Sequence, residues 1–229
     1  MSTRRTREES QVITRNRLIA VAAAVFARRG YRAATLAEIA EEAGYTVGAI
    51  YSNFATKEDL FLAAIDEHLG SALEEVAAVF LEAPTLEEAA RRAGVGAMTR
   101  LRDDPDWFPL FVEAWAFALR DPKFRPRFAL RQTTSHRLLV DMLEQRLERE
   151  GRRCPDGRLE EVALALKALY HGVALEMATN PGAVADEALG SVIALLLQGL
   201  VSDLPAGAAA GDDRTARRAR RRSGRPAVG

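Results

Sequence analysis

The side chains best suited to chemistry in this sequence lie in one short segment, residues 35–59, which reads TLAEIAEEAGYTVGAIYSNFATKED. Thr35, Thr46 and Thr56 each stand where a helix is expected to begin, and an acidic residue follows Thr35 and Thr56 three positions later, as in a capping box. The free N–H groups at a helix start attract anions, and side chains beside them can bind base edges. The segment therefore offers the chemistry of phosphate and base-edge recognition.

Three residues of this segment have the spacing of a helix-turn-helix motif. Ala40 is small enough to let two helices approach, Gly44 can supply the positive φ of a tight turn, and Ile50 can lock the second helix onto the first. The short helix at residues 46–53 would then project outward, as a helix that enters the major groove does. With Ile50 and Phe54 turned into the core, we expect the outward-facing residues to be Thr46, Val47, Gly48, Ala49, Tyr51 and Ser52.

Two blocks, AVFARRGYRAATLAEIAEEAG and YTVGAIYSNFATKEDLF, together span residues 24–61 and resemble the TetR family of one-component bacterial repressors. The family pattern joins a helix ending in Gly-Tyr, a threonine-capped helix, an Ala-Gly turn, a short helix ending in Tyr-x-x-Phe, and a Ser/Thr-Lys-Glu-x-Leu helix start. The sequence departs from this pattern at Asn53, where many members have histidine, and at Tyr45 and Thr46, where Val-Ser is common. Neither change removes a required chemical group.

The resemblance implies that Thr35, Tyr51 and Lys57 hold phosphates of double-stranded DNA. Gly48 and Ala49 are short enough to let the helix sink into the groove, so that the two residues before them can meet base edges. Tyr51 could instead be a partly buried aromatic residue, and Lys57 could be a solvated lysine. A cation is unfavourable at a helix N-terminus, so an anionic ligand beside Lys57 is the better account.

The composition predicts an all-α fold of about nine helices. Hydrophobic residues make up 48% of the 229 residues, which suffices for a core, and the helix formers Ala, Leu, Glu and Arg dominate. The formal net charge is zero, but residues 1–60 carry +2 and residues 206–229 carry +5, which leaves −7 on the rest. Basic ends around an acidic middle suit a protein whose ends hold an anionic partner.

The chain is expected to divide into a small head and a larger body. A helix from Thr56 to about Leu81 begins in the head and ends in the body, so it could transmit motion. The expected parts are a disordered arm at residues 1–10, a helix-turn-helix domain at 11–60, a ligand-binding and dimerisation domain at 61–205, and a disordered basic tail at 206–229.

The tail contains Gly-Arg-Pro at residues 224–226, flanked by arginines, and so resembles an AT-hook, which binds the minor groove. Ser223 stands where that motif usually has arginine. We therefore favour a solubilising basic tail.

Aromatic residues concentrate in the expected body, where seven of the fifteen lie between residues 107 and 128. Trp107, Phe111 and Trp115 recur at i, i+4 and i+8, so we expect them to share one helix face. For a single ring, ordinary core is the better interpretation, but the cluster and the resemblance together favour the wall of a pocket for an apolar or aromatic effector. Glu113 could meet a cationic ligand or face solvent. Later helices could complete the pocket through His136, Met142, Tyr170 and Met177.

The last two expected helices, residues 159–179 and 186–202, are apolar on more than one face. Such a helix needs two partners, of which one is the core and the other a second subunit in a symmetric four-helix seam. The resemblance implies the same homodimer. Close approach in this seam could be allowed by Gly172, Gly190 and Gly199, with Val192 and Leu196 among its apolar side chains.

Enzymatic chemistry finds little support in the sequence. His68, His136 and His171 fall on separate helices without metal-ligand spacing, and neither a Gly-rich phosphate loop nor a nucleophile elbow occurs. We therefore expect no catalytic residue, metal or cofactor. The single Cys154, the lack of a signal peptide and the lack of an apolar run of about 18 residues favour the cytoplasm and no membrane.

These patterns, together with the resemblance, predict a transcriptional repressor that binds a palindromic operator as a homodimer and is released by a small-molecule ligand. The alternative is a helical small-molecule-binding protein whose head has lost its DNA function. The joint presence of Thr35, Thr46, Tyr51 and Lys57 argues against that alternative.

Overall fold

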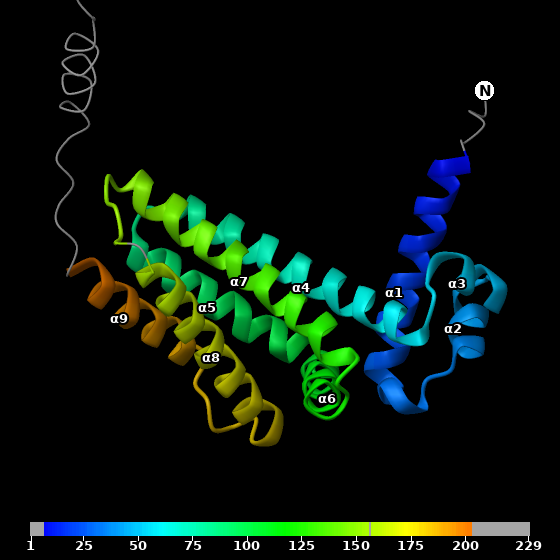
Figure 1. The fold of residues 1–229 in the computed structure, drawn as a ribbon. Helices are drawn as coiled ribbons and strands as arrows, with labels where there is room; N and C mark the ends of the chain where they lie inside the picture. Colours follow the sequence, from blue (N-terminus) through cyan, green and yellow to red (C-terminus); the bar gives the residue numbers. More distant parts are fainter. Residues whose placement is uncertain (1–6, 156, 203–229) are drawn as a thin grey trace, which may run out of the picture.

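The computed structural model describes residues 7–155 and 157–202, and these ranges form helices with no strands, as expected (Figure 1). The arginine-rich tail and the first six residues of the expected arm lie outside the described residues. The first helix already begins at Arg7, so the expected disorder is wrong for residues 7–10. The nine helices of the described ranges are α1 (Arg7–Ala33), α2 (Leu36–Ala43), α3 (Val47–Asn53), α4 (Lys57–Glu82), α5 (Leu86–Asp103), α6 (Trp107–Arg120), α7 (Phe124–Arg149), α8 (Arg158–Thr179) and α9 (Ala188–Ser202).

Helices α1 to α3 gather at one end of the molecule, which we call the head, and α5 to α9 form the body at the other end (Figure 1). Helix α4 runs from the head along the body and contacts α1, α5 and α7. Helix α5 packs most extensively against α9, and α8 packs against α7. Helix α4 therefore connects the head to the body, as the sequence predicts.

Threonine caps begin the helices of the head, as the sequence predicts. The side chains of Thr35, Thr46 and Thr56 each accept a hydrogen bond from the backbone N–H three residues later, at 3.1 to 3.2 Å. Such caps satisfy an N–H group that has no partner inside the helix, and each contributes about 1 kcal/mol. Between α2 and α3, Gly44 has φ 77° and closes the turn in the left-handed region.

Helix α1 is broken at Gly30, which has φ 76° and ψ 159°. The predicted stop is confirmed, although helical structure continues to Ala33 beyond the break. A residue with a Cβ rarely adopts this φ, so glycine is required here. The break turns the chain toward α2 and leaves the Tyr31 N–H without a helical acceptor.

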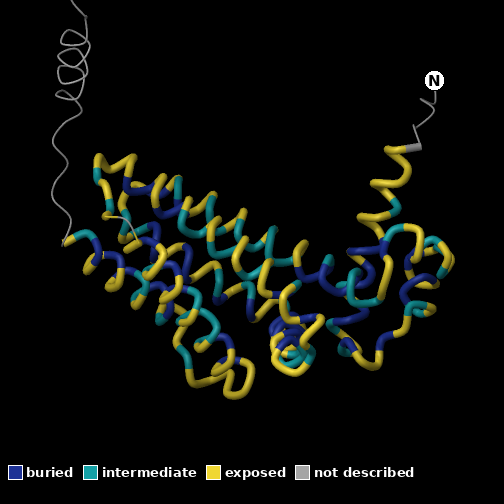
Figure 2. The backbone as a smooth tube through the Cα atoms, in the orientation of Figure 1, coloured by how far each residue is buried: buried dark blue, intermediate teal, exposed yellow. Residues whose placement is uncertain are grey.

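One hydrophobic core crosses from the head into the body. Phe26 of α1 and Ile39 of α2 are fully buried in the same cluster as Phe61 of α4 and Phe111 of α6. A second cluster fills the far end of the body, around residues such as Leu143 and Leu197 (Figure 2). Because the first core is shared, a change of packing in the near half of the body acts directly on the head.

Helices α5 and α9 touch through two glycines. A Cβ added to Gly94 would lie 2.2 Å from the Cα of Gly190, and one added to Gly190 would lie 2.7 Å from the Arg91 carbonyl oxygen. Both contacts are with backbone atoms, which cannot move aside as the end of a flexible side chain can. Gly190 was expected in the seam between subunits, but its close approach is internal to the chain, so that expectation is wrong.

We predict that Gly94→Ala lowers the free energy of unfolding by about 1–3 kcal/mol, since the added methyl group overpacks the α5–α9 contact. Gly96 lies on the same helix with no atom within 4 Å of an added Cβ. The matched control Gly96→Ala should therefore leave stability unchanged or raise it by about 0.5–1 kcal/mol. Urea unfolding followed by circular dichroism measures both variants, and equal midpoints would contradict the contact.

Candidate nucleic-acid interface and internal cavity

Helix α3 presents one face to solvent and the other to the core. Ile50 is fully buried and Phe54 is 4% exposed, so both anchor the helix as predicted. On the opposite face, Tyr51 is 58% exposed and Ser52 is also exposed. The Ser52 hydroxyl donates to the Gly48 carbonyl at 2.9 Å, which leaves its oxygen free to accept another bond.

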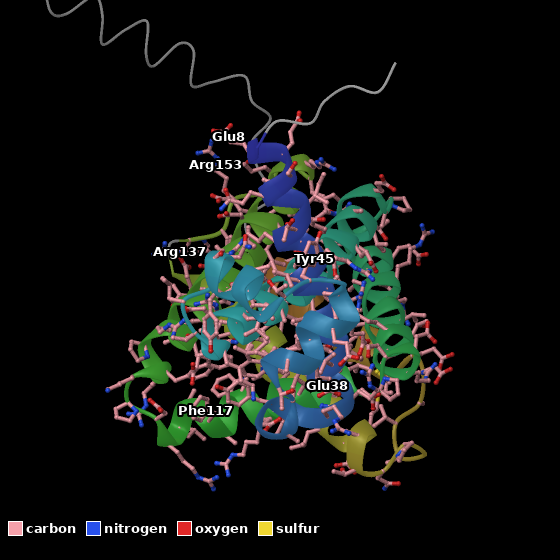
Figure 3. All side chains as sticks on the ribbon, turned by 90° about the vertical axis from the view of Figure 1, so that its right-hand side faces the viewer. Glu8, Glu38, Tyr45, Phe117, Arg137 and Arg153 are labelled. Carbon is pink, nitrogen blue, oxygen red and sulfur yellow. The ribbon has the colours of Figure 1, made fainter. Side chains whose placement is uncertain are left out.

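Most of the predicted DNA-contacting residues lie at the surface of the head, which faces the viewer in Figure 3. Val47, Ala49 and Lys57 are half-buried, whereas the other residues of this set are exposed to solvent. The capping hydroxyls of Thr35 and Thr46 accept from the backbone, so each keeps its own hydrogen to donate to an outside acceptor. The exposed residues of the set are Thr35, Thr46, Gly48, Tyr51 and Ser52.

Lys57 differs from the rest of this set because its ammonium points inward. Its Nζ donates to the Tyr31 carbonyl oxygen and lies 4.6 Å from the centroid of the Tyr31 ring. Burial lowers the pKa of Lys57, partly opposed by Glu58 and Glu113. The sequence analysis expected an anionic ligand beside the Lys57 ammonium at the start of α4. Within the described residues, the ammonium instead donates to the Tyr31 carbonyl oxygen. A phosphate contact by Lys57 stays a prediction.

Tyr31 joins the head to the body. Its backbone N–H, freed by the break at Gly30, donates to Glu113 Oε2 of α6 at 2.8 Å. Its buried ring packs against Phe61 of α4 and Phe117 of α6, with centroids 4.6 and 5.4 Å apart. Burial and a hydrogen bond to the Glu58 carboxylate raise the pKa of the Tyr31 hydroxyl. Glu113 is half-buried and accepts this bond from within the chain, a role that sequence reasoning had not considered for it.

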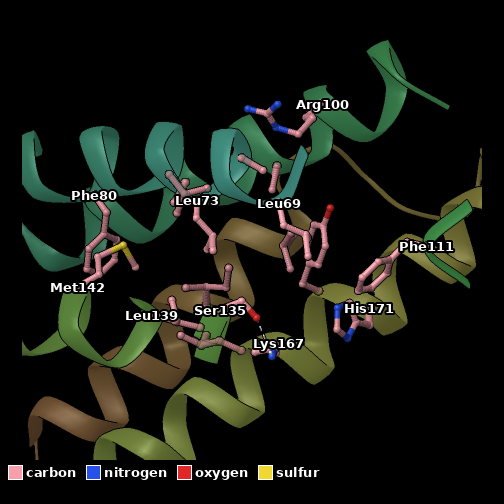
Figure 4. A pocket seen from close by; sticks show the side chains of 18 of the residues that line it. Leu69, Leu73, Phe80, Arg100, Phe111, Ser135, Leu139, Met142, Lys167 and His171 are labelled. Atoms are coloured by element: carbon pink, nitrogen blue, oxygen red, sulfur yellow. Dashed lines mark hydrogen bonds between the residues drawn. The ribbon is translucent and has the colours of Figure 1, made fainter. Parts of the chain in front are cut away.

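The body contains a cavity of about 180 Å³, shown in Figure 4. Residues of α4 to α9 line it, and most of them are apolar. The predicted residues Trp107, Phe111 and Tyr170 are among them, but Trp115 and His136 are not. Trp115 is 39% exposed and packs edge-on against Phe128 instead. The cavity is thus assembled from three of the five residues predicted to bind ligand.

Two histidines in the cavity wall are uncharged at neutral pH. His68 stacks on Trp107 with ring centroids 3.6 Å apart. Burial lowers the pKa of His68 to about 4 despite nearby Asp104. Burial and the charge of Lys167 lower the pKa of His171 to about 4 as well. The wall also includes Lys167, a residue that sequence reasoning missed, although a lone charge in the apolar stretch LALKALY was a signal for it.

Helices α8 and α9 carry many exposed residues (Figure 2), and large apolar side chains are among them. Leu196 is 41% exposed and Val192 is 40% exposed, and their place in a seam between subunits stays a prediction. No atom lies within 4 Å of a Cβ added to Gly172 or Gly199, so both leave open space. The exposed apolar residues of these helices are Leu164, Leu175, Val192, Leu195 and Leu196.

Other kinds of site find no support in the part of the chain that the structure describes. No cluster of three or more potential metal ligands occurs there. None of the described helices is long and apolar enough to cross a membrane. Burial raises the pKa of the Cys154 thiol, which disfavours a reactive thiolate.

Comparison with known proteins agrees with the geometry. Residues 18–64 match the model of bacterial regulatory proteins of the tetR family, and residues 86–202 match that of the C-terminal region of BetI-type transcriptional repressors. The chain is 28% identical over 196 residues to the transcriptional repressor AcnR of Corynebacterium efficiens, covering 82% of this chain and 93% of AcnR. AcnR of Corynebacterium jeikeium is 30% identical over 165 residues, or 69% of this chain and 77% of that protein.

A solved structure has the same fold. A TetR-family transcriptional regulator from Mesorhizobium loti, described as putative, superposes with a TM-score of 0.67 at 19% identity, covering 87% of this chain and 99% of that one. The two matched regions lie on the head and on the body from α5 onward. The chain therefore belongs to the TetR family of bacterial transcriptional regulators.

Proposed function

We propose that this regulator is a cytoplasmic repressor that binds a palindromic operator as a homodimer and leaves it when a small ligand fills the body cavity. The observation that carries the proposal is the placement of α4 and α6, because both line the cavity and both hold the head. In this account residues 11–60 form the DNA-binding domain and residues 61–205 the ligand-binding and dimerisation domain, with the core shared between them.

The exposed face of α3 supports DNA binding. Gly48 has no side chain, which allows the helix backbone to approach base edges, and the exposed hydroxyls of Thr35 and Tyr51 can donate to phosphates. The relatives named AcnR are repressors, which favours repression for this chain. The alternative, a ligand-binding protein with a silent head, leaves the exposed polar face of α3 unexplained.

The exposed apolar side chains of α8 and α9 support a dimer. A monomer would leave Leu164, Leu195 and Leu196 in water, whereas a two-fold seam of four helices would bury them. Two heads are needed because one α3 reads one half-site. Their separation must be near one DNA turn, roughly 34–36 Å, for both to enter successive major grooves.

The release step follows from the position of the cavity. His68 to Phe80 of α4 and Trp107 to Phe111 of α6 contribute to its wall. A ligand that displaces either helix moves the head, because α4 begins there and Glu113 of α6 holds the Tyr31 N–H. The ligand can release DNA only by its preference for the displaced state, typically about 1–3 kcal/mol.

We predict that Gly48→Leu weakens binding to operator DNA by about tenfold or more, which corresponds to about 1.4 kcal/mol. An added Cβ meets only the Thr46 side chain, at 3.6 Å, so the free protein has room for it and the loss would arise at the DNA. Fluorescence anisotropy with labelled intergenic DNA from beside the gene measures the affinity.

The control for this prediction is Gly96→Leu, a matched change at an exposed helical glycine of the body. It should bind DNA as the wild type does. Thermal unfolding should show both variants folded. If Gly48→Leu keeps full affinity while remaining folded, α3 does not approach the bases.

We predict that Leu196→Glu yields monomers and abolishes operator binding, because the charge would be buried in an apolar seam at a cost of several kcal/mol. Leu119, which is 69% exposed on α6, provides the control Leu119→Glu, which should remain dimeric. Sedimentation velocity distinguishes the two states. A folded Leu196→Glu protein that sediments as a dimer would move the interface to another face.

A further inference from the structure

The cavity wall carries a positive charge that no carboxylate of the described residues balances. Its lining contains the cations Arg100 and Lys167 but no aspartate or glutamate. The Arg100 guanidinium pairs with the Glu75 carboxylate. The Lys167 ammonium instead donates to neutral oxygens, the Gln132 carbonyl at 3.0 Å and Gln132 Oε1 and Ser135 Oγ at 3.2 Å each.

This arrangement leaves the Lys167 ammonium poorly stabilised. Burial lowers the pKa of Lys167, since the ammonium has lost much of its hydration. Hydrogen bonds from a cation to an anion are about 2.7–2.9 Å long, so the two contacts at 3.2 Å are weak ones. Both of those acceptors are side-chain oxygens that can rotate away. An incoming carboxylate could therefore displace one of them and supply the missing negative charge.

An unused hydrogen-bond donor lies beside the ammonium. Gln132 Nε2 is buried and has no partner, which is unusual for a buried polar atom. The amide orientation is set by Lys167, because its ammonium requires the Gln132 oxygen and not the nitrogen. The free end of the amide is thus the –NH₂ group. Together the ammonium and this amide form a pair of donors that matches the two oxygens of a carboxylate.

The rest of the wall is suited to an apolar group. Figure 4 shows Ser135, Lys167 and His171 in one part of the cavity and Phe80 and Met142 at another end. Leucines from α4 and α7 contribute to the wall, and uncharged His171 does not compete for an anion. A cavity of about 150 Å³ can hold a single aromatic ring, so the 180 Å³ here accommodates a ligand of modest size.

We infer that the effector of this regulator is a small amphipathic monoanion, whose carboxylate is bound by Lys167 and Gln132 and whose apolar body lies toward Phe80 and Met142. The inference rests on the proposed function, of which it specifies the ligand class. A ligand cation would meet Lys167 without a carboxylate to offset the repulsion. A dianion would bring one charge more than the single unpaired ammonium balances.

The charge preference is testable with three probes of equal chain length: octanoate, 1-octanol and octylammonium. Isothermal titration calorimetry, with quenching of tryptophan fluorescence as a second readout, gives the affinity of the full-length protein for each. Octanoate should bind at least about tenfold more tightly than octanol, because one hydrogen bond to a charged group contributes about that much to the affinity. Octylammonium should bind most weakly. Chains of six and ten carbons test whether length limits binding.

Variants assign the preference to the proposed residues. Lys167→Met should weaken the binding of octanoate by about tenfold, while the binding of octanol should be unchanged or tighter. Lys167→Arg should keep the preference for octanoate, and Gln132→Leu should reduce it. Lys123 is exposed on the surface, so Lys123→Met is a matched control that should behave as the wild type. Circular dichroism confirms that each variant is folded.

The outcomes separate this inference from the proposed function. Equal binding of octanoate and octanol, or an undiminished preference in folded Lys167→Met, would overturn the carboxylate site and leave an apolar effector cavity intact. Failure of every probe and chain length to bind would overturn both the carboxylate site and the cavity as an effector site. Loss of operator binding by the unliganded wild type would overturn the proposed function alone.

Discussion

The hydrogen bond from the Tyr31 N–H to the Glu113 carboxylate joins the head to the body where α1 is broken. The break at Gly30 frees a backbone donor in a part-buried position, where an unsatisfied N–H costs about 1–3 kcal/mol. Glu113 satisfies that donor, and Lys57 satisfies the carbonyl of the same residue. Any movement of α6 that withdraws Glu113 therefore raises the energy of the head in its present position.

The cavity lies next to this link. Phe111 is part of the cavity wall and precedes Glu113 by two residues on α6, so a rigid shift of the helix carries both. Phe111 also belongs to the core that Phe26 and Ile39 of the head share. Packed cores transmit displacement because they contain little free volume. The same geometry holds the head in its present position and, under the proposed function, would couple that position to a ligand in the body.

The sequence predicts local structure well because its signals are local. Capping threonines at 35, 46 and 56, the turn at Gly44 and the break at Gly30 each act within a few residues. The cavity was harder to predict. Residues four apart on a helix are rotated by about 40°, so a residue at i+8 is about 80° from i. Trp115 therefore turns away from the face that Trp107 and Phe111 share, and where the cavity wall ends along this helix depends on how the neighbouring helices pack.

Partnerships between distant residues could not be predicted from spacing. Glu113 and Tyr31 are 82 positions apart, and Lys167 meets Gln132 across 35 positions. Gly190 was assigned to the wrong surface because a glycine in an apolar helix has the same appearance whether it faces α5 or a second subunit. These contacts depend on how helices pack, and they include the residues that carry the proposed effector site.

The central claim is that Glu113 transmits the state of the cavity to the head. Its most direct test is the operator affinity of wild type and Glu113→Met, each with and without saturating octanoate. We expect octanoate to weaken wild-type binding by about 5- to 150-fold, the usual range of allosteric coupling. In Glu113→Met, which still has the cavity but lacks the acceptor for Tyr31, the factor should fall toward one while octanoate binds normally. An equal factor in both proteins, or none in the wild type, would contradict the account.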